Sequence, residues 1–115
     1  MKRATDICPK FEAAAELLGK RWTGLLVQQL LAGPRRFSEL AAAIQVSERV
    51  LSERLKELED AGVVDRKVHP DPPVRVEYKL TSKGEALSVV VDAIASWADR
   101  WVEPKGTTKS RKKTA

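Results

Sequence analysis

The chain has 115 residues, of which 43% are apolar and 32% are charged, a composition ordinary for a globular domain with one hydrophobic core. The single cysteine excludes a framework of intrachain disulfides. With one cysteine and one histidine, a zinc site within one chain is not expected either, so we expect no metal and no other cofactor. The net charge of +5 arises entirely from residues 104–115, because residues 1–103 hold 16 basic and 16 acidic side chains.

Two helices are expected at the N-terminal end. Pro9 suits a first helical turn, where its missing N–H costs nothing, so we expect a helix that Cys8 caps and Gly19 ends. A second helix is expected over about 22–31, before Gly33-Pro34. The apolar residues spaced to face the core along these two helices are Phe11, Ala14, Ala15, Leu17, Leu18, Trp22, Leu25, Leu26 and Leu30.

The middle of the chain predicts a short extended segment at 35–37 and then two helices joined by a three-residue turn. Ser38 is the expected N-cap of a helix of about two turns that turns Leu40, Ala41 and Ile44 inward. Ser47 is the expected N-cap of the next helix, which runs to about residue 61 and stops at Gly62. The core-facing side of that helix is set by Leu51, Leu55 and Leu58.

The spacing of apolar residues then changes from the helical pattern to strict alternation, which predicts a β-hairpin, and a final helix follows. Residues 74–80 alternate apolar and polar, and residues 63–69 are the expected antiparallel partner, joined to them by the proline-rich loop 70–73. The sequence from Ser82 to Glu85 reads as a capping box that opens the last helix. We therefore predict a mainly α protein with a small β-hairpin, a winged helix-turn-helix with extra N- and C-terminal dimerisation helices.

The two ends of the chain bear on location and charge. The N-terminus lacks the apolar block of a signal peptide, and no apolar run reaches the roughly 18 residues of a membrane span, so we expect a cytoplasmic protein without membrane contact. Residues 1–103 are expected to form one DNA-binding and dimerisation domain. Residues 104–115 carry five basic and no acidic residues, so we expect a disordered basic tail. Such a tail either increases solubility or is left over from cloning, or it tethers the protein to phosphates.

A helix-turn-helix followed by a hairpin favours double-stranded DNA as the partner, because one helix can enter the major groove while the wing reaches a neighbouring phosphate or minor groove. Arg49 suits bidentate binding to guanine, Ser52 a base edge or phosphate, and Glu53 the cytosine amino group. The alternative for each charged residue is an ordinary solvated charge. The candidate DNA-binding residues are Arg35, Arg36, Ser38, Ser47, Glu48, Arg49, Ser52, Glu53, Lys56, Lys67, His69 and Arg75.

The last helix carries a longer apolar stripe than a domain of this size needs. Tryptophan side chains near a chain end are rarely left in water, which predicts a homodimer that uses this helix and the N-terminal ones. The alternative is that Trp97 and Trp101 pack back over the chain's own first helices. The candidate interface residues are Phe11, Leu18, Trp22, Leu87, Val90, Val91, Ile94, Trp97 and Trp101.

Cys8 is a candidate redox sensor. The partial positive charge at a helix N-terminus favours a thiolate, which would react with oxidants or with a small electrophilic effector, or bridge to its symmetry mate in a dimer. The alternative is an unreactive cap residue.

Several short motifs, in order, resemble those of the HxlR family, bacterial winged helix-turn-helix transcriptional regulators similar to the MarR group. The motifs are Cys8-Pro9, LLGKRW at 17–22, RFSEL at 36–40, LKELE at 55–59, GVV at 62–64 and VEYKLT at 76–81 through Gly84. The resemblance implies a homodimer on a palindromic operator, commonly a repressor and sometimes an activator. It also implies a sensor of thiol-reactive compounds at the Cys-Pro position, which here is Cys8.

The chain departs from the family pattern at two places, and its basic tail is not part of that pattern. The turn before the second helix of the helix-turn-helix, Ile44-Gln-Val-Ser47, is one residue shorter than the common form. Arg49 and Val50 stand where other members vary, so the resemblance does not carry over an operator sequence.

These observations favour a sequence-specific regulator that acts as a repressor on an inverted-repeat operator and is switched by thiol chemistry at Cys8. An alternative is a winged-helix module for protein–protein interaction, which the balanced charge of residues 1–103 favours. An enzyme is not expected, because the sequence has no glycine-rich phosphate loop, no metal cluster and no Ser/His/Asp set.

Overall fold

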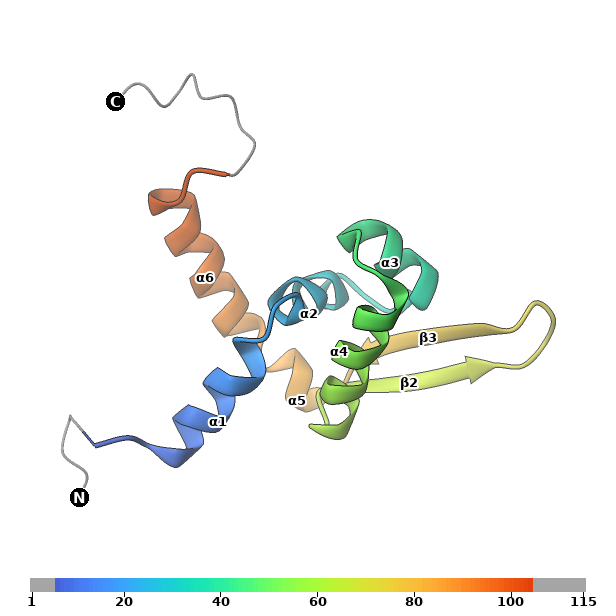
Figure 1. The fold of residues 1–115 in the computed structure, drawn as a ribbon, viewed down its shortest axis with the longest axis horizontal. Coiled ribbons are helices and arrows are strands. Elements are labelled where there is room, and N and C mark those ends of the chain that lie inside the picture. Colours follow the sequence, from blue (N-terminus) through green and yellow to red (C-terminus); the bar gives the residue numbers. More distant parts are fainter. Residues whose placement is uncertain (1–5, 105–115) are drawn as a thin grey trace.

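A computed structural model describes residues 6–104 and contains a helix-turn-helix next to a three-stranded sheet (Figure 1). Helices α1 and α6 project from one side of α2, and the β2–β3 hairpin projects from the other side. The tail predicted for residues 104–115 lies outside the described residues, apart from Pro104. The elements in chain order are α1 (Pro9–Leu18), α2 (Thr23–Leu31), β1 (Arg35–Arg36), α3 (Phe37–Ile44), α4 (Glu48–Asp60), β2 (Val64–His69), β3 (Arg75–Leu80), α5 (Ser82–Glu85) and α6 (Ser88–Trp101).

The hydrophobic core lies between α2, α3, α4 and the sheet. Each of these helices contributes side chains spaced three or four residues apart, so that one face of every helix is turned to the centre. The inward face predicted for α4 is confirmed, because its three leucines are buried. The core residues are Leu26, Val27, Leu30, Leu40, Leu51, Leu55, Leu58, Val63, Val64, Tyr78 and Leu80.

The sheet has the strand order β1-β3-β2, with both neighbouring pairs antiparallel. The predicted hairpin is confirmed to within one residue at each strand, and Tyr78 and Leu80 are buried while Lys79 is exposed, as the alternation requires. The pairing of β1 with β3 was not predicted: Arg35 lies opposite Tyr78, and Arg36 lies opposite Glu77. This third strand ties the start of α3 to the wing.

The N-cap of α3 differs from the prediction, whereas the N-cap of α4 is confirmed. The N-cap of α3 is Arg36 rather than Ser38, and the Arg36 backbone N–H donates to Glu39 Oε1 over 2.8 Å. The helix therefore begins directly after the strand pairing of residue 36 ends. At α4, the Val50 backbone N–H donates to Ser47 Oγ over 3.2 Å, which satisfies one of the first free N–H groups of the helix.

The predicted single C-terminal helix is wrong, because the chain turns between α5 and α6. Thr81 rather than Ser82 caps α5, with Thr81 Oγ1 accepting from the Gly84 N–H over 3.1 Å. A Cβ at Gly84 would overlap the Val63 carbonyl oxygen, so α5 packs against the start of the wing at closer range than any other residue allows. The Leu87 N–H then bonds to the Gly84 carbonyl, which tightens the turn before α6 begins.

The inward face predicted for α1 and part of that predicted for α2 are also wrong. No residue of α1 is buried, and Phe11 is 74% exposed. Ala14 and Ala15 are exposed as well, and only Leu17 and Leu18 are half-buried. On α2, Leu25 points outward, and Thr23 and Val27 fill core positions instead. The residues expected to face the chain's own core that instead face outward are Phe11, Ala14, Ala15 and Leu25.

Helix α6 is similarly uncovered. Ile94, Trp97 and Trp101 are 60%, 62% and 65% exposed, so the two tryptophans do not pack back over the first helices of the same chain. Only the start of the helix reaches the core, through the half-buried Val91 and through Leu87 just before it. Among the described residues, no helix is long and apolar enough to cross a membrane.

Candidate nucleic-acid interface

Helix α4 presents a polar face opposite its buried leucines. The capped N-terminus and the inward leucine face together fix which side chains point outward, and the Arg49 side chain is 86% exposed. All the candidate DNA-binding residues predicted on this helix are exposed, namely Glu48, Arg49, Ser52, Glu53 and Lys56.

Three of these exposed side chains form ion pairs along the helix. Arg49 Nε lies 3.6 Å from Glu53 Oε2, and Lys56 Nζ lies 3.1 Å from Asp60 Oδ1. Exposed pairs at this spacing stabilise a helix by about 0.3–0.5 kcal/mol, whereas a bidentate contact with the right base discriminates by about 1–3 kcal/mol. Arg49 is therefore held loosely and is free to exchange its partner for a base edge.

A groove of about 550 Å³ separates α4 from the wing. Arginines from three elements line it, because Arg36 comes from β1, Arg66 from β2 and Arg75 from β3. The polar side chains of Ser38 and Ser52 complete its helical side, and none of the described residues that line it is acidic. Its chemistry suits an anionic ligand such as a phosphate backbone.

Sequence reasoning missed Arg66 as a groove residue. Arg66 lies directly opposite Tyr78 in the antiparallel ladder, and the Tyr78 side chain is buried against the core. Opposed residues share a face of the sheet, so the register places Arg66 on the helix-facing side of the wing. The signal was present in the two-residue alternation of strand 64–69, but the register was needed to read it.

The other predicted basic residues are placed less favourably for a common site. His69 Nε2 lies 3.3 Å from Glu77 Oε1, so this imidazole already has a partner on the next strand. Lys67 is exposed and lies opposite Glu77 in the ladder. The half-buried Arg35 donates from NH1 to the Pro34 carbonyl oxygen over 3.2 Å, and it does not line the groove.

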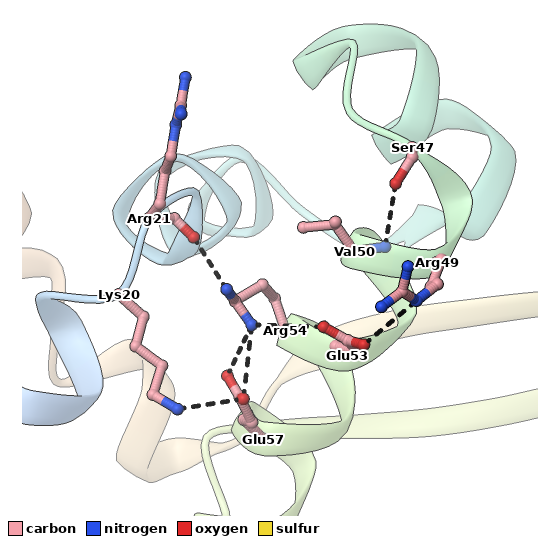
Figure 2. Close-up of polar contacts among 8 residues, drawn as sticks. All are labelled: Lys20, Arg21, Ser47, Arg49, Val50, Glu53, Arg54 and Glu57. Carbon is pink, nitrogen blue, oxygen red and sulfur yellow. Dashed lines mark hydrogen bonds and ion pairs between the residues drawn. The ribbon is translucent and has the colours of Figure 1, made fainter.

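The flank of α4 that faces α2 carries a second set of charges (Figure 2). Arg54 Nε donates to the Arg21 carbonyl oxygen over 3.0 Å, and Lys20 Nζ lies 3.1 Å from Glu57 Oε2. Sequence reasoning did not predict this contact between Arg54 and the α1–α2 turn. These contacts fix α4 against the turn between the first two helices.

The candidate dimer residues include large apolar side chains that are exposed on α1 and on α6. Val90 is exposed like the large side chains that follow it on α6, and Arg100 stacks its guanidinium over the Trp101 ring at 5.2 Å. Trp22 is half-buried and lines a second groove, of about 380 Å³, between α2 and α6. Leu18, Leu87 and Val91 are half-buried, so they have less surface left to offer another molecule.

Cys8 sits at the N-cap of α1 with its side chain half-buried. Its carbonyl oxygen accepts from the Glu12 N–H over 2.9 Å, while its side chain makes no capping hydrogen bond. Among the described residues, no group of three or more His, Cys, Asp or Glu side chains is placed to hold a metal ion.

Comparison with known proteins identifies a family. A family model described as HxlR-like helix-turn-helix matches residues 17–106. The HTH-type transcriptional regulator YvaP of Bacillus subtilis is 54% identical over 101 residues, covering 87% of this chain and 94% of YvaP. The HTH-type transcriptional regulator YodB of the same species is 47% identical over 108 residues, covering 93% of this chain and 96% of YodB. These relatives are transcriptional regulators rather than enzymes.

Solved structures of redox-responsive regulators share the fold. The reduced form of YodB superposes with a TM-score of 0.74 at 49% identity, covering 86% of this chain and 98% of YodB, and YodB has also been solved bound to a quinone. The redox regulator HypR in its reduced form superposes with a TM-score of 0.75 at 32% identity, covering 79% of this chain and 91% of HypR.

Proposed function

This chain belongs to the HxlR-like helix-turn-helix family of transcriptional regulators, and we propose that it binds double-stranded DNA sequence-specifically as a homodimer on an inverted-repeat operator. The observation that carries the proposal is the arrangement of α4 beside the arginine-lined groove. A helix with an exposed polar face projects next to a wing, and the space between them is lined by basic and neutral side chains.

In the proposed complex, α4 contacts the bases, and the arginines of the groove contact the phosphates. The N-terminal half of α4 enters the major groove, where Arg49 binds guanine O6 and N7 and Ser52 contacts a base edge or phosphate. Arg36, Arg66 and Arg75 then bind the phosphates that pass between α4 and the wing. Base contacts provide the specificity, and the phosphate contacts set the orientation of the protein on the duplex.

The proposed dimer rests on the uncovered apolar face. Phe11, Ile94, Trp97 and Trp101 are each at least 60% exposed on helices that bury little or nothing within the chain. A second copy of the same face covers these side chains, because an isologous contact places like surfaces against each other. A twofold dimer then presents two copies of α4 to two half-sites of a palindrome. The dimer acts as a repressor when such a site overlaps a promoter.

The proposed switch is thiol chemistry at Cys8, supported by the quinone-bound form of YodB and the redox regulation of HypR. The Cys8 thiolate adds its electron pair to a ring carbon of a quinone and forms a C–S bond. The ring takes up one proton from solvent, the hydrogen on the attacked carbon moves to the other oxygen, and the product is a hydroquinone thioether. With an oxidant such as diamide, two Cys8 thiols of a dimer give up two electrons and two protons to the azo bond and form a disulfide. Either product changes the start of α1 and releases the DNA.

Selection of bound duplexes from a randomised library at near-physiological salt tests the proposed DNA binding. The expected result is an enriched inverted repeat whose half-sites lie about one helical turn apart. Enrichment of a single half-site contradicts the dimer, and binding without enrichment contradicts base reading. Absence of binding favours the alternative of a protein-interaction module.

The switch is tested on the selected duplex with wild-type protein and Cys8→Ser. Titration with a quinone or diamide is expected to release the wild type and to leave Cys8→Ser bound, and intact mass measurement is expected to show the adduct or the crosslinked dimer. Equal release of both proteins contradicts a role for Cys8.

A further inference from the structure

We propose that Arg54 is a positioning residue that sets the orientation of α4 relative to the α1–α2 turn (residues 19–22), so that movement of α1 reaches the DNA-reading side chains. The inference rests on the proposed function, since it names how the DNA-binding helix is held and controlled. It concerns the flank of α4 that faces α2 rather than the face directed to DNA (Figure 2).

The Arg54 guanidinium bonds to several acceptors at once. Only 21% of its side chain is exposed, and Nε donates to the backbone carbonyl oxygen of Arg21 over 3.0 Å. Its NH1 lies 3.4 Å from Glu57 Oε2 and 3.9 Å from Glu53 Oε1. A planar fork of donors joins such differently placed acceptors in one fixed geometry, which a lysine ammonium cannot reproduce.

A second contact ties the same turn to the same helix. Lys20 Nζ lies 3.1 Å from Glu57 Oε2, the carboxylate that also faces Arg54. Adjacent residues of the α1–α2 turn are therefore bound to two positions of α4 that lie three residues apart on one flank. A helix held at two such points resists rotation about its own axis, and this rotation is what would turn its base-reading face away from DNA.

The contacts continue to the DNA-reading side of the helix. Glu53 lies between two cations, with Arg54 NH1 at 3.9 Å and Arg49 Nε at 3.6 Å. The charges alternate from Lys20 through Glu57, Arg54 and Glu53 to Arg49, and we call these five residues the charge ladder. In free protein the ladder runs from the α1–α2 turn to the candidate guanine-binding residue, which leaves Glu53 when it binds a base. The contacts that hold α4 against the turn are those of Lys20, Glu57 and Arg54.

The turn that carries the Arg21 carbonyl is short and connects α1 directly to α2. Trp22 caps α2 in the left-handed region with φ of 80°, a conformation that a large side chain adopts only when its surroundings hold it there. Only four residues separate the end of α1 from the start of α2, and the Thr23 N–H bonds back to the Lys20 carbonyl over 3.2 Å. A displacement of α1 therefore moves the Arg21 carbonyl to which Arg54 is bound.

The test compares Arg54→Met, Arg54→Lys and wild type for binding to the selected duplex and to a random duplex over a range of salt concentrations. Arg54→Met is expected to lose about tenfold in affinity for the selected duplex and less than about twofold for the random one, with the salt slope unchanged. Arg54→Lys is expected to recover only part of the loss. The matched control is Lys79→Met, which removes one positive charge from an exposed strand position and is expected to keep the ratio of the two affinities.

Two results overturn the inference. Unchanged discrimination by Arg54→Met shows that Arg54 does not position α4. Equal losses on both duplexes with a salt slope reduced by about one show a direct phosphate contact instead. Failure of the wild type to select any duplex is a separate outcome, which contradicts the proposed function and the inference with it.

A double-mutant cycle tests the tie to the turn even if Arg54→Met does not fold. Lys20→Met and Glu57→Gln each remove one partner of the same contact, and neither residue is among the candidate DNA-binding residues. If the contact transmits orientation, the double variant loses no more affinity for the selected duplex than the more impaired single variant. Losses that multiply overturn the proposal.

Discussion

The body of the protein, formed by α2–α4 and the sheet, buries its apolar side chains, whereas the helices at the two ends, α1 and α6, expose theirs. In α2–α4 and the sheet, large side chains such as Leu26, Leu40 and Leu58 are completely buried. In α1 and α6, side chains of similar or greater size remain in contact with solvent, for example Phe11 and Trp97. Neither helix contains a buried residue.

This difference distinguishes a region that one chain completes from a region that one chain leaves open. A ten-residue helix is marginal in water without packing partners, so α1 gains its stability from surface contacts that this chain supplies only at Leu17 and Leu18. Burial of the exposed surface of the two α6 tryptophans would stabilise the protein by about 25 cal/mol for each Å² of apolar surface removed from water. We therefore expect a second copy of the chain to bury the apolar side chains of α1 and α6, as the core buries those of α2–α4.

The largest expected effect is a loss of stability in the body of the protein. Leu26→Ala is expected to lower the free energy of unfolding by about 2–5 kcal/mol, because the side chain is fully buried among core residues. The matched control is Leu25→Ala on the same helix, where the side chain is half exposed and the expected loss is below about 1 kcal/mol. Urea unfolding of both variants provides the comparison. Equal losses would contradict the assignment of the core face of α2.

A smaller effect separates the end helices from the body. Trp97→Glu is expected to weaken dimerisation by at least about 2 kcal/mol, since it places a charge in the centre of the apolar face of α6. Circular dichroism is expected to keep the signal of the folded body, while sedimentation shows the loss of the dimer. The control is Asp92→Ala, an exposed position on the same helix. A Trp97→Glu protein with unchanged mass in solution would contradict the proposed interface.

The smallest expected effect concerns the junction between the two regions. Thr81 Oγ1 accepts from the Gly84 N–H over 3.1 Å and donates to the Gly62 carbonyl oxygen over 2.6 Å. Thr81→Ala is therefore expected to cost about 1–2 kcal/mol in thermal or urea unfolding, and Ser82→Ala less than about 0.5 kcal/mol. The reverse ranking would restore Ser82 as the helix cap.

The parts of the fold that the sequence predicts well are those whose signals are local. The spacing of Leu51, Leu55 and Leu58 and the cap at Ser47 are read within one helix, and the structure confirms both. The periodicity of α1 and α6 shows equally well that each has an apolar face. It does not say whether the same chain covers that face, and this is why the inward placement of Phe11 was wrong.

The parts that escaped prediction depend on contacts distant in sequence. Arg54 and the carbonyl it binds are 33 residues apart, and nothing near either residue indicates the other. Arg66 enters the groove only through its register opposite Tyr78, and β1 becomes a strand only because β3 lies beside it. The exposed face of α4 was predicted, but the arginines that face it across the groove were identified only in part.

The most direct test of the account is the molar mass of the wild-type chain at micromolar concentration, measured by light scattering. A second copy that covers α1 and α6 predicts a mass twice the 12.8 kDa of one chain. A mass of one chain, with the body folded, would contradict the claim that the open face is completed by another copy of the same protein.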